Sequence, residues 1–154
     1  ALGWFPLAEE MFAVIDHLEP IAERIIGSAT RDGFQSLSQE EQVFFLVWGY
    51  AGQVANGGHA QFFFNTLGAY SEETVTALTQ VGCPEIASLL NRSVSLFPDR
   101  RVPTDLEARN DALLELPDSA DPILEALDRR FFFLGGDELL LKRLADFWKE
   151  HCGA

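Results

Sequence analysis

Signals that start and end helices recur along the whole sequence. Ser38-Gln39-Glu40-Glu41 is a capping box, in which the serine hydroxyl accepts a first-turn N–H while the Glu41 side chain reaches back to the Ser38 backbone. Glycine and proline stand at intervals suited to helices, and no alternating apolar run long enough for a strand interrupts them. The pattern predicts an all-α fold of about seven or eight helices.

The segment after the capping box should form the centre of the core. Residues 43–54 are apolar nearly all round, as expected of a helix with neighbours on every side. Asn56-Gly57-Gly58 should end this helix, because Asn and Gly tolerate the left-handed conformation that closes one. Elsewhere we expect Pro20 to restart a short helix that Gly27 ends, and Thr104 to cap a later helix.

The chain of 154 residues has the length of one domain, and no linker or repeat divides it, so residues 1–154 should form a single all-helical domain. It has two cysteines, Cys83 and Cys152, and no signal-peptide pattern, which favours a reduced, cytoplasmic protein. The longest apolar run, residues 43–51, is far shorter than the roughly 20 residues that span a membrane.

The charge balance restricts the class of partner. Asp and Glu number 24 against 11 Lys and Arg, which leaves a net charge of −13. Nucleic-acid binding depends on Lys and Arg that neutralise phosphates, so direct nucleic-acid binding is not expected, nor is docking on anionic lipid. The expected partners are cationic, and they include proteins that themselves bind DNA.

The sequence contains no recognisable enzyme signature. The three histidines, His17, His59 and His151, belong to no Glu-x-x-His or His-Glu-x-x-His motif, and no phosphate-binding glycine loop or nucleophile elbow occurs. Asp16-His17 and His151-Cys152 are sequence neighbours, which do not face each other on a helix. We therefore assign no catalytic residue, no metal site and no cofactor, and expect a protein that is not an enzyme.

One stretch combines polar amides with aromatic residues in an unusual way. Gln61 and Asn65 are four residues apart, so both amides point the same way on a helix, and Asn56 stands close enough to join them. The amides either tie neighbouring helix ends together, with the phenylalanines in the core, or they form the floor of a small-ligand pocket. The residues singled out here are Asn56, Gly57, Gly58, His59, Gln61, Phe63 and Asn65.

This run, NGG-x-x-Q-F-F-x-N, resembles the signature of a bacterial family of unknown-function domains that includes a DNA-mimic protein. The similarity extends from about residue 40 to residue 151, with one departure at His59, where we expect an aromatic residue. The resemblance implies an all-helical fold and, for the DNA-mimic member, an acidic dimer that occupies the DNA-binding surfaces of a transcriptional regulator and a histone-like protein.

Acidic residues gather in the second half of the chain. Glu107, Asp111 and Glu115 are spaced by four and form a stripe on one helix, and a second stripe follows on the next. Arg109 is the one basic residue among them, and we expect ion pairs of Asp105 with Arg109 and of Glu125 with Arg129. The candidate partner-binding residues are Asp105, Glu107, Asp111, Glu115, Asp118, Asp121, Glu125 and Asp128.

These observations favour an acidic protein-binding module, a DNA mimic that occupies the DNA-binding surface of a basic DNA-binding protein or transcription regulator. Acidic helix faces also serve simply to keep a protein soluble. Two further alternatives stay open. One is an immunity-type inhibitor of a toxin, and the other is a small-ligand-binding protein that uses Asn56, His59, Gln61 and Asn65. The family resemblance adds the expectation of a homodimer.

Overall fold

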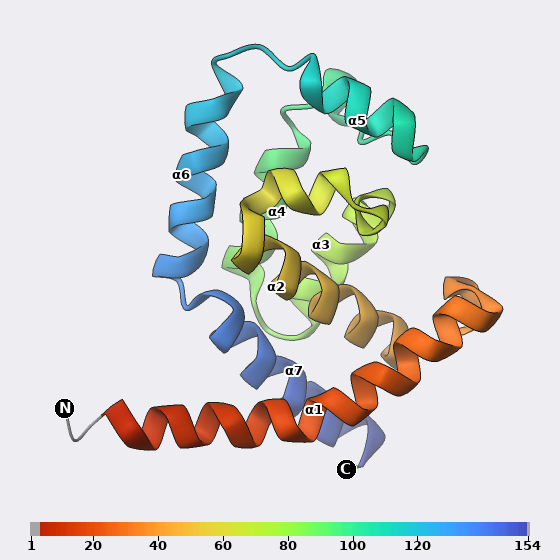
Figure 1. Ribbon diagram of the computed structural model, residues 1–154, viewed down its shortest axis with the longest axis vertical. Coiled ribbons are helices and arrows are strands. Elements are labelled where there is room, and N and C mark those ends of the chain that lie inside the picture. The colour runs from red at the N-terminus through yellow and green to blue at the C-terminus, as the bar shows by residue number, and fades with distance from the viewer. Residues whose placement is uncertain (1–3, 154) are drawn as a thin grey trace.

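In residues 4–153, which the computed structural model describes with side chains from Glu9 onward, seven α-helices and no strand are found (Figure 1). Helices make up 84% of the structure, which confirms the all-α prediction. Three short 3-10 helices connect the α-helices: η1 (Phe34–Ser36), η2 (Thr66–Tyr70) and η3 (Pro98–Arg100). The α-helices are α1 (Trp4–Asp32), α2 (Gln39–Phe64), α3 (Ser71–Gln80), α4 (Pro84–Val94), α5 (Leu106–Leu114), α6 (Ala120–Phe133) and α7 (Gly136–Cys152).

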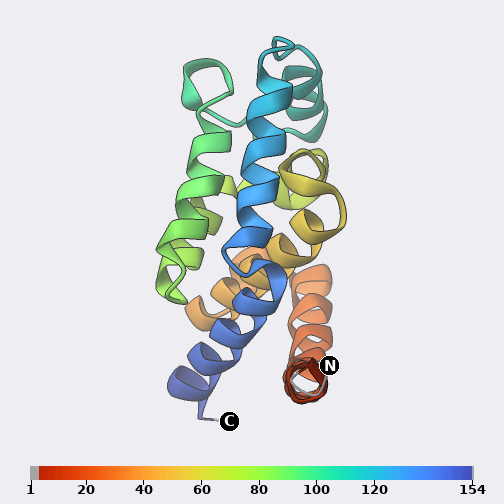
Figure 2. The ribbon, with the colours of Figure 1, turned by 90° about the vertical axis from the view of Figure 1, so that its left-hand side faces the viewer.

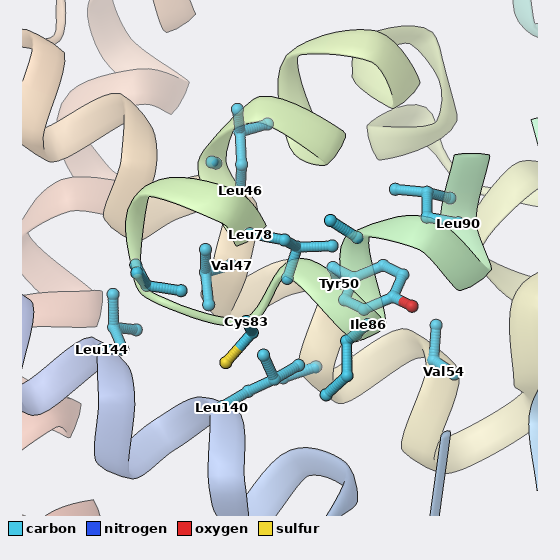
Figure 3. Packing of buried hydrophobic residues seen from close by; sticks show 14 of the residues in the cluster. Leu46, Val47, Tyr50, Val54, Leu78, Cys83, Ile86, Leu90, Leu140 and Leu144 are labelled. Carbon is cyan, nitrogen blue, oxygen red and sulfur yellow. The ribbon is translucent and has the colours of Figure 1, made fainter. Parts of the chain in front are cut away.

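Helix α2 lies at the centre, and every other α-helix except α4 packs closely against it. The predicted capping box is confirmed, since the Ser38 hydroxyl accepts the Glu41 N–H at 3.1 Å and the Ser38 N–H donates to the Glu41 carboxylate at 2.9 Å. The Ser38 N–H is the main reason that the pKa of Glu41 lies below its usual value, despite the opposing effect of burial. Figure 3 shows side chains of α2, α3, α4 and α7 interleaved in one cluster, as the apolar pattern of α2 requires.

Helix α2 changes direction at Gly57 and Gly58 (Figure 1). Gly57 has φ −147° and ψ 18°, and Gly58 has φ 75° and ψ −175°, so neither residue is helical. The predicted end of the first helix is therefore confirmed as a break in the backbone. The helix then resumes as residues 59–64, which we call the aromatic segment and which ends at Phe64.

Helix α1 is continuous from Trp4 to Asp32, so the predicted restart at Pro20 and end at Gly27 are wrong. A proline inside a helix removes one backbone hydrogen bond, and packing must offset that loss. One face of α1 supplies this packing against α2 and α7 with three buried side chains, Leu18, Ala22 and Ile25. At Pro20 and Gly27, tertiary contacts therefore outweigh the local tendency of proline and glycine to end a helix.

The cap of α5 also differs by one residue from the prediction. Asp105, rather than Thr104, is the N-cap, because its carboxylate accepts the N–H of Ala108 at 2.9 Å.

No helix within residues 4–153 combines the length and the apolar character needed to cross a membrane.

The break in α2 generates a stability prediction. We expect Gly58→Ala to lower the free energy of unfolding by about 2 kcal/mol or more, because alanine disfavours a positive φ and its Cβ would overlap the Asp128 carboxylate. Chemical denaturation followed by circular dichroism measures the change. Gly52→Ala is the matched control, since it lies in open space on α2 and should stabilise the protein by up to about 1 kcal/mol. Equal effects of the two substitutions would contradict the assigned role of Gly58.

Candidate functional site

The acidic residues singled out in the sequence lie at the N-cap of α5, on α5, on α6 and in the loop between the two helices. Seven of the eight are exposed, and we call these seven the acidic surface: Asp105, Glu107, Asp111, Glu115, Asp118, Asp121 and Glu125. Figure 1 shows α5 and α6 meeting end to end at an angle, at one end of the molecule. Helix α5 packs on α2 and η2, and α6 packs on α2, α4 and α7, so α2 is the neighbour that the two acidic stripes share.

Arg109, the one basic residue within this acidic stretch, is turned into the protein. Its side chain is 1% exposed and donates to four backbone carbonyls. Nε donates to Phe63 O at 2.7 Å, Nη2 to Asn65 O at 2.7 Å, and Nη1 to Pro103 O and Thr104 O at 3.0 Å each. These bonds join α5 and the loop before it to the end of the aromatic segment.

The burial of Arg109 corrects the expected ion pairs. Within the described residues neither Asp105 with Arg109 nor Glu125 with Arg129 forms an ion pair. Burial lowers the pKa of Arg109 from its usual value, and the nearby Asp105 charge acts in the opposite direction. A guanidinium nonetheless stays protonated in proteins, so Arg109 is a buried cation held by carbonyl oxygens. The acidic surface consequently has no exposed Lys or Arg within its own sequence range.

Gly68 makes room for this arrangement. A Cβ at this position would lie 2.6 Å from Arg109 Nε and 2.9 Å from Phe63 O, so no larger residue fits while the guanidinium keeps its place. The guanidinium therefore contacts the backbone of the turn directly. Spacing and composition give no signal for this close approach, because Gly68 and Arg109 are far apart in the sequence.

Asp128, the eighth acidic residue, is partly buried and differs from the other seven. Its Oδ1 accepts the backbone N–H of His59 at 2.9 Å and lies 2.7 Å from His59 Nδ1. On the other side of the ring, Nε2 of His59 lies 2.9 Å from the Tyr50 hydroxyl. With Nδ1 donating to the carboxylate, Nε2 is the acceptor for the tyrosine O–H in the neutral ring.

The chain of hydrogen bonds from Asp128 through His59 to Tyr50 follows the carboxylate–imidazole–hydroxyl order of a catalytic relay, but the histidine and the hydroxyl are closed to solvent. Tyr50 and His59 are both 0% exposed, so no substrate reaches them. Burial, and secondarily the charge of Asp128, raises the pKa of Tyr50 well above its usual value, which keeps the hydroxyl protonated. The chain joins α2, the aromatic segment and α6, and its geometry serves packing.

The amides of the signature form a second network, which connects residues before the break to residues after it. Gln53 Oε1 accepts Gln61 Nε2 at 2.6 Å and Asn65 Nδ2 at 2.9 Å, and Asn56 Nδ2 donates to Gln61 Oε1 at 3.0 Å. Asn65 Nδ2 also donates to Gln61 O at 2.9 Å. Gln53 was missed in the sequence, although a polar residue in an otherwise apolar helix was a signal for it.

Phe63, the remaining side chain of the signature, is fully buried. Its ring contacts Phe62 and Phe97 in edge-on arrangements, with centroids 5.5 and 4.9 Å apart. The signature residues are thus bonded to one another or packed in the core, which supports their structural interpretation. Three grooves of the described chain lie elsewhere, and none of these three is lined by a signature residue.

Groups of His, Cys, Asp and Glu placed to hold a metal ion are not found among the described residues. Cys83 is buried and Cys152 exposed, and both are free thiols. Burial raises the pKa of Cys83, with Arg143 opposing the shift, so this thiol is a poor nucleophile.

Comparison with known proteins gives one match. The family model described as DMP19-like protein matches residues 35–151, a range that contains α2 to α6 and nearly all of α7. No curated protein and no solved structure matches the chain. The matched range includes the acidic surface and leaves out α1.

The role of Arg109 leads to a prediction. Arg109→Met should lower the free energy of unfolding by about 3 kcal/mol or more, because four carbonyls lose their donor in a buried site. Urea denaturation measures the loss, and Arg129→Met, an exposed substitution of the same chemistry, should change stability by less than about 0.5 kcal/mol. Similar stability of the two variants would rule out Arg109 as an anchor.

A second prediction separates Asp128 from the acidic surface. Asp128→Ala should destabilise the protein by about 1–3 kcal/mol, since the buried His59 N–H groups lose their acceptor. Glu125→Ala, one turn earlier on α6 and exposed, should leave the melting temperature nearly unchanged. Thermal melts of both variants give the comparison. An unchanged melting temperature of Asp128→Ala would contradict the structural role of Asp128.

Proposed function

Because the chain belongs to the DMP19-like protein family, named after DNA mimic protein 19, we propose that its acidic surface binds a basic DNA-binding protein or transcription regulator in place of DNA. The observation that carries the proposal is the uninterrupted negative charge of Asp105–Glu125. The range has seven exposed carboxylates, and its single cation, Arg109, is buried. A partner approaching this surface meets carboxylates with no competing cation from the same segment.

The mechanism is electrostatic occupancy of a DNA-binding surface. A four-residue step on a helix rises about 6 Å, against about 3.4 Å per phosphate along one DNA strand, so one stripe is sparser than a strand. Two stripes from one chain, doubled in a homodimer, come closer to the density of phosphates. We include the homodimer and a reducing, cytoplasmic setting in the proposal, on the strength of the family and of the two free thiols.

The range matched by the family model favours α5 and α6 as the partner-binding region, because it contains both helices and excludes the other acidic region. A second set of acids, which includes Asp16, Glu19 and Glu23, lies on α1, outside the matched range. The nearby Arg24 pairs with Glu41 at 2.8 Å, and its guanidinium lies 5.8 Å from the centre of the Trp148 ring. Arg24 thereby helps to hold α1 against α2 and α7.

Because the acids of α1 lie outside the matched range, they provide a control for the binding role proposed for the acidic surface.

The proposed function is non-enzymatic, since it needs only charge and shape. The two other interpretations of the sequence make different predictions. An immunity-type inhibitor would hold one partner through buried anchors, with little sensitivity to salt or DNA. A small-ligand site at the signature would need free amides, whereas Gln53, Asn56, Gln61 and Asn65 are bonded to one another.

The test is capture of basic proteins from a bacterial lysate at low salt, followed by elution with duplex DNA. We expect DNA-binding proteins to be captured and then released both by DNA and by raised salt, because exposed charges carry the contact. The triple variant Glu107→Lys, Asp111→Lys, Glu115→Lys should capture at least about tenfold less of them, since like charges then face each other.

A matched triple variant on α1 distinguishes location from net charge. Asp16→Lys, Glu19→Lys, Glu23→Lys changes the net charge by the same amount and should capture the same proteins nearly as well as the unmodified protein. Circular dichroism checks that both variants stay helical. Equal losses in the two triples would show that net charge alone governs capture, and a partner that resists DNA and salt would favour the inhibitor interpretation.

A further inference from the structure

A groove with a volume of about 620 Å³ lies between α4 and α6. The two helices run side by side in opposite directions (Figure 2). The apolar lining comes mainly from Leu89 of α4, from Ile123 and Leu127 of α6, and from Leu134 just after α6. Ligand sites typically have volumes of this order, with an apolar lining and a few placed polar groups.

One end of this groove is cationic. Arg92, near the end of α4, lines the groove and also a neighbouring hollow of about 350 Å³, which Arg100 of η3 lines as well. Within the described residues neither arginine takes part in an ion pair. In a chain with 24 acidic residues, two adjoining arginines without a carboxylate partner mark a site for an anion.

The backbone around Arg100 adds to this observation. Asp99 and Arg100 have φ values of 57° and 55°, a left-handed conformation that residues other than glycine rarely adopt. Two such residues in succession raise the conformational energy of the backbone, and other contacts of the folded protein must offset this cost. The strained turn lies where the Arg100 side chain borders the hollow beside Arg92.

The acids of α6 do not neutralise this end. At 100° per residue, Asp121 and Glu125 lie roughly on the opposite side of α6 from Ile123 and Leu127, so they project away from the groove. The one acidic residue in the lining is Glu85, at the beginning of α4. Because the helices run in opposite directions (Figure 2), the first turn of α4, which contains Glu85, is at the same end of the groove as the last turn of α6, which contains Arg130. The groove is therefore polarised along its length.

We propose that this groove binds a small organic anion with an apolar body, a carboxylate amphiphile. Its carboxylate contacts Arg92 and Arg100, whose planar guanidinium groups match a carboxylate in two parallel hydrogen bonds. Its apolar part lies along the groove over Leu89, Ile123 and Leu127. The site does not depend on the proposed partner, because it lies on the side of α6 away from the acids.

The test uses decanoate as the probe and isothermal titration calorimetry of the full chain as the measurement. Decanoate should bind, and decyltrimethylammonium, which has the same tail with a cationic head, should not. Shortening the acid to octanoate and hexanoate should weaken binding at least about twofold for each carbon removed, since the tail is buried in part.

Variants locate the site. Arg92→Gln with Arg100→Gln should weaken decanoate binding at least about tenfold, because the head loses both charged donors. Arg31→Gln with Arg129→Gln is the matched control. It removes the same charge from exposed positions outside the groove and should leave the affinity unchanged. Ile123→Asp tests the apolar part separately and should also weaken binding, with helicity checked by circular dichroism.

The outcomes divide clearly. Binding that depends on the anionic head, on tail length and on the Arg92–Arg100 pair supports the site. Absence of decanoate binding overturns it. Equal affinity in the Arg92–Arg100 variant and its control, or equally tight binding of decyltrimethylammonium, also overturns it. Loss of this site leaves the partner-binding proposal untouched, because the lysate experiment uses different variants and a different readout.

Discussion

The break of α2 at Gly57 and Gly58 is the constraint on which the arrangement of the later helices depends. Without it, 26 residues would form a rod of about 39 Å. The turn instead redirects the aromatic segment, so that His59 meets Asp128 of α6 and the carbonyls of Phe63 and Asn65 meet Arg109 of α5. Both helices that carry the acidic surface are therefore anchored to the few residues after one backbone break.

Much of this fold follows from local patterns, because caps, glycines and apolar periodicity act over a few residues. The capping box at Ser38 and the break at Gly57 and Gly58 were predicted on these grounds and are confirmed. Pro20 shows the limit of such reasoning, since its effect on α1 is outweighed by packing against α2 and α7. Helix boundaries depend on contacts that no short window contains.

The site was less predictable than the fold for the same reason. Spacing alone predicted that Arg109 pairs with Asp105, yet its acceptors are carbonyls up to 46 residues away. Asp128 fits the acidic stripe by its spacing, but its partner is His59, 69 residues earlier. Whether a charged residue faces solvent or the interior is decided by the fold, which explains why spacing did not predict the partners of these two residues.

The buried guanidinium of Arg109 has a consequence for the ions around the protein. Carboxylates on a strongly acidic surface attract mobile cations from solution, and a basic partner gains entropy by displacing them, as proteins do on DNA. Arg109 is a counter-ion that no partner can displace, because backbone carbonyls hold it in the interior, near the charge of Asp105. It offsets part of the mutual repulsion of the surface carboxylates from within, at every salt concentration, while leaving their outer side free for mobile ions. In the proposed complex with a basic protein, release of these ions favours binding.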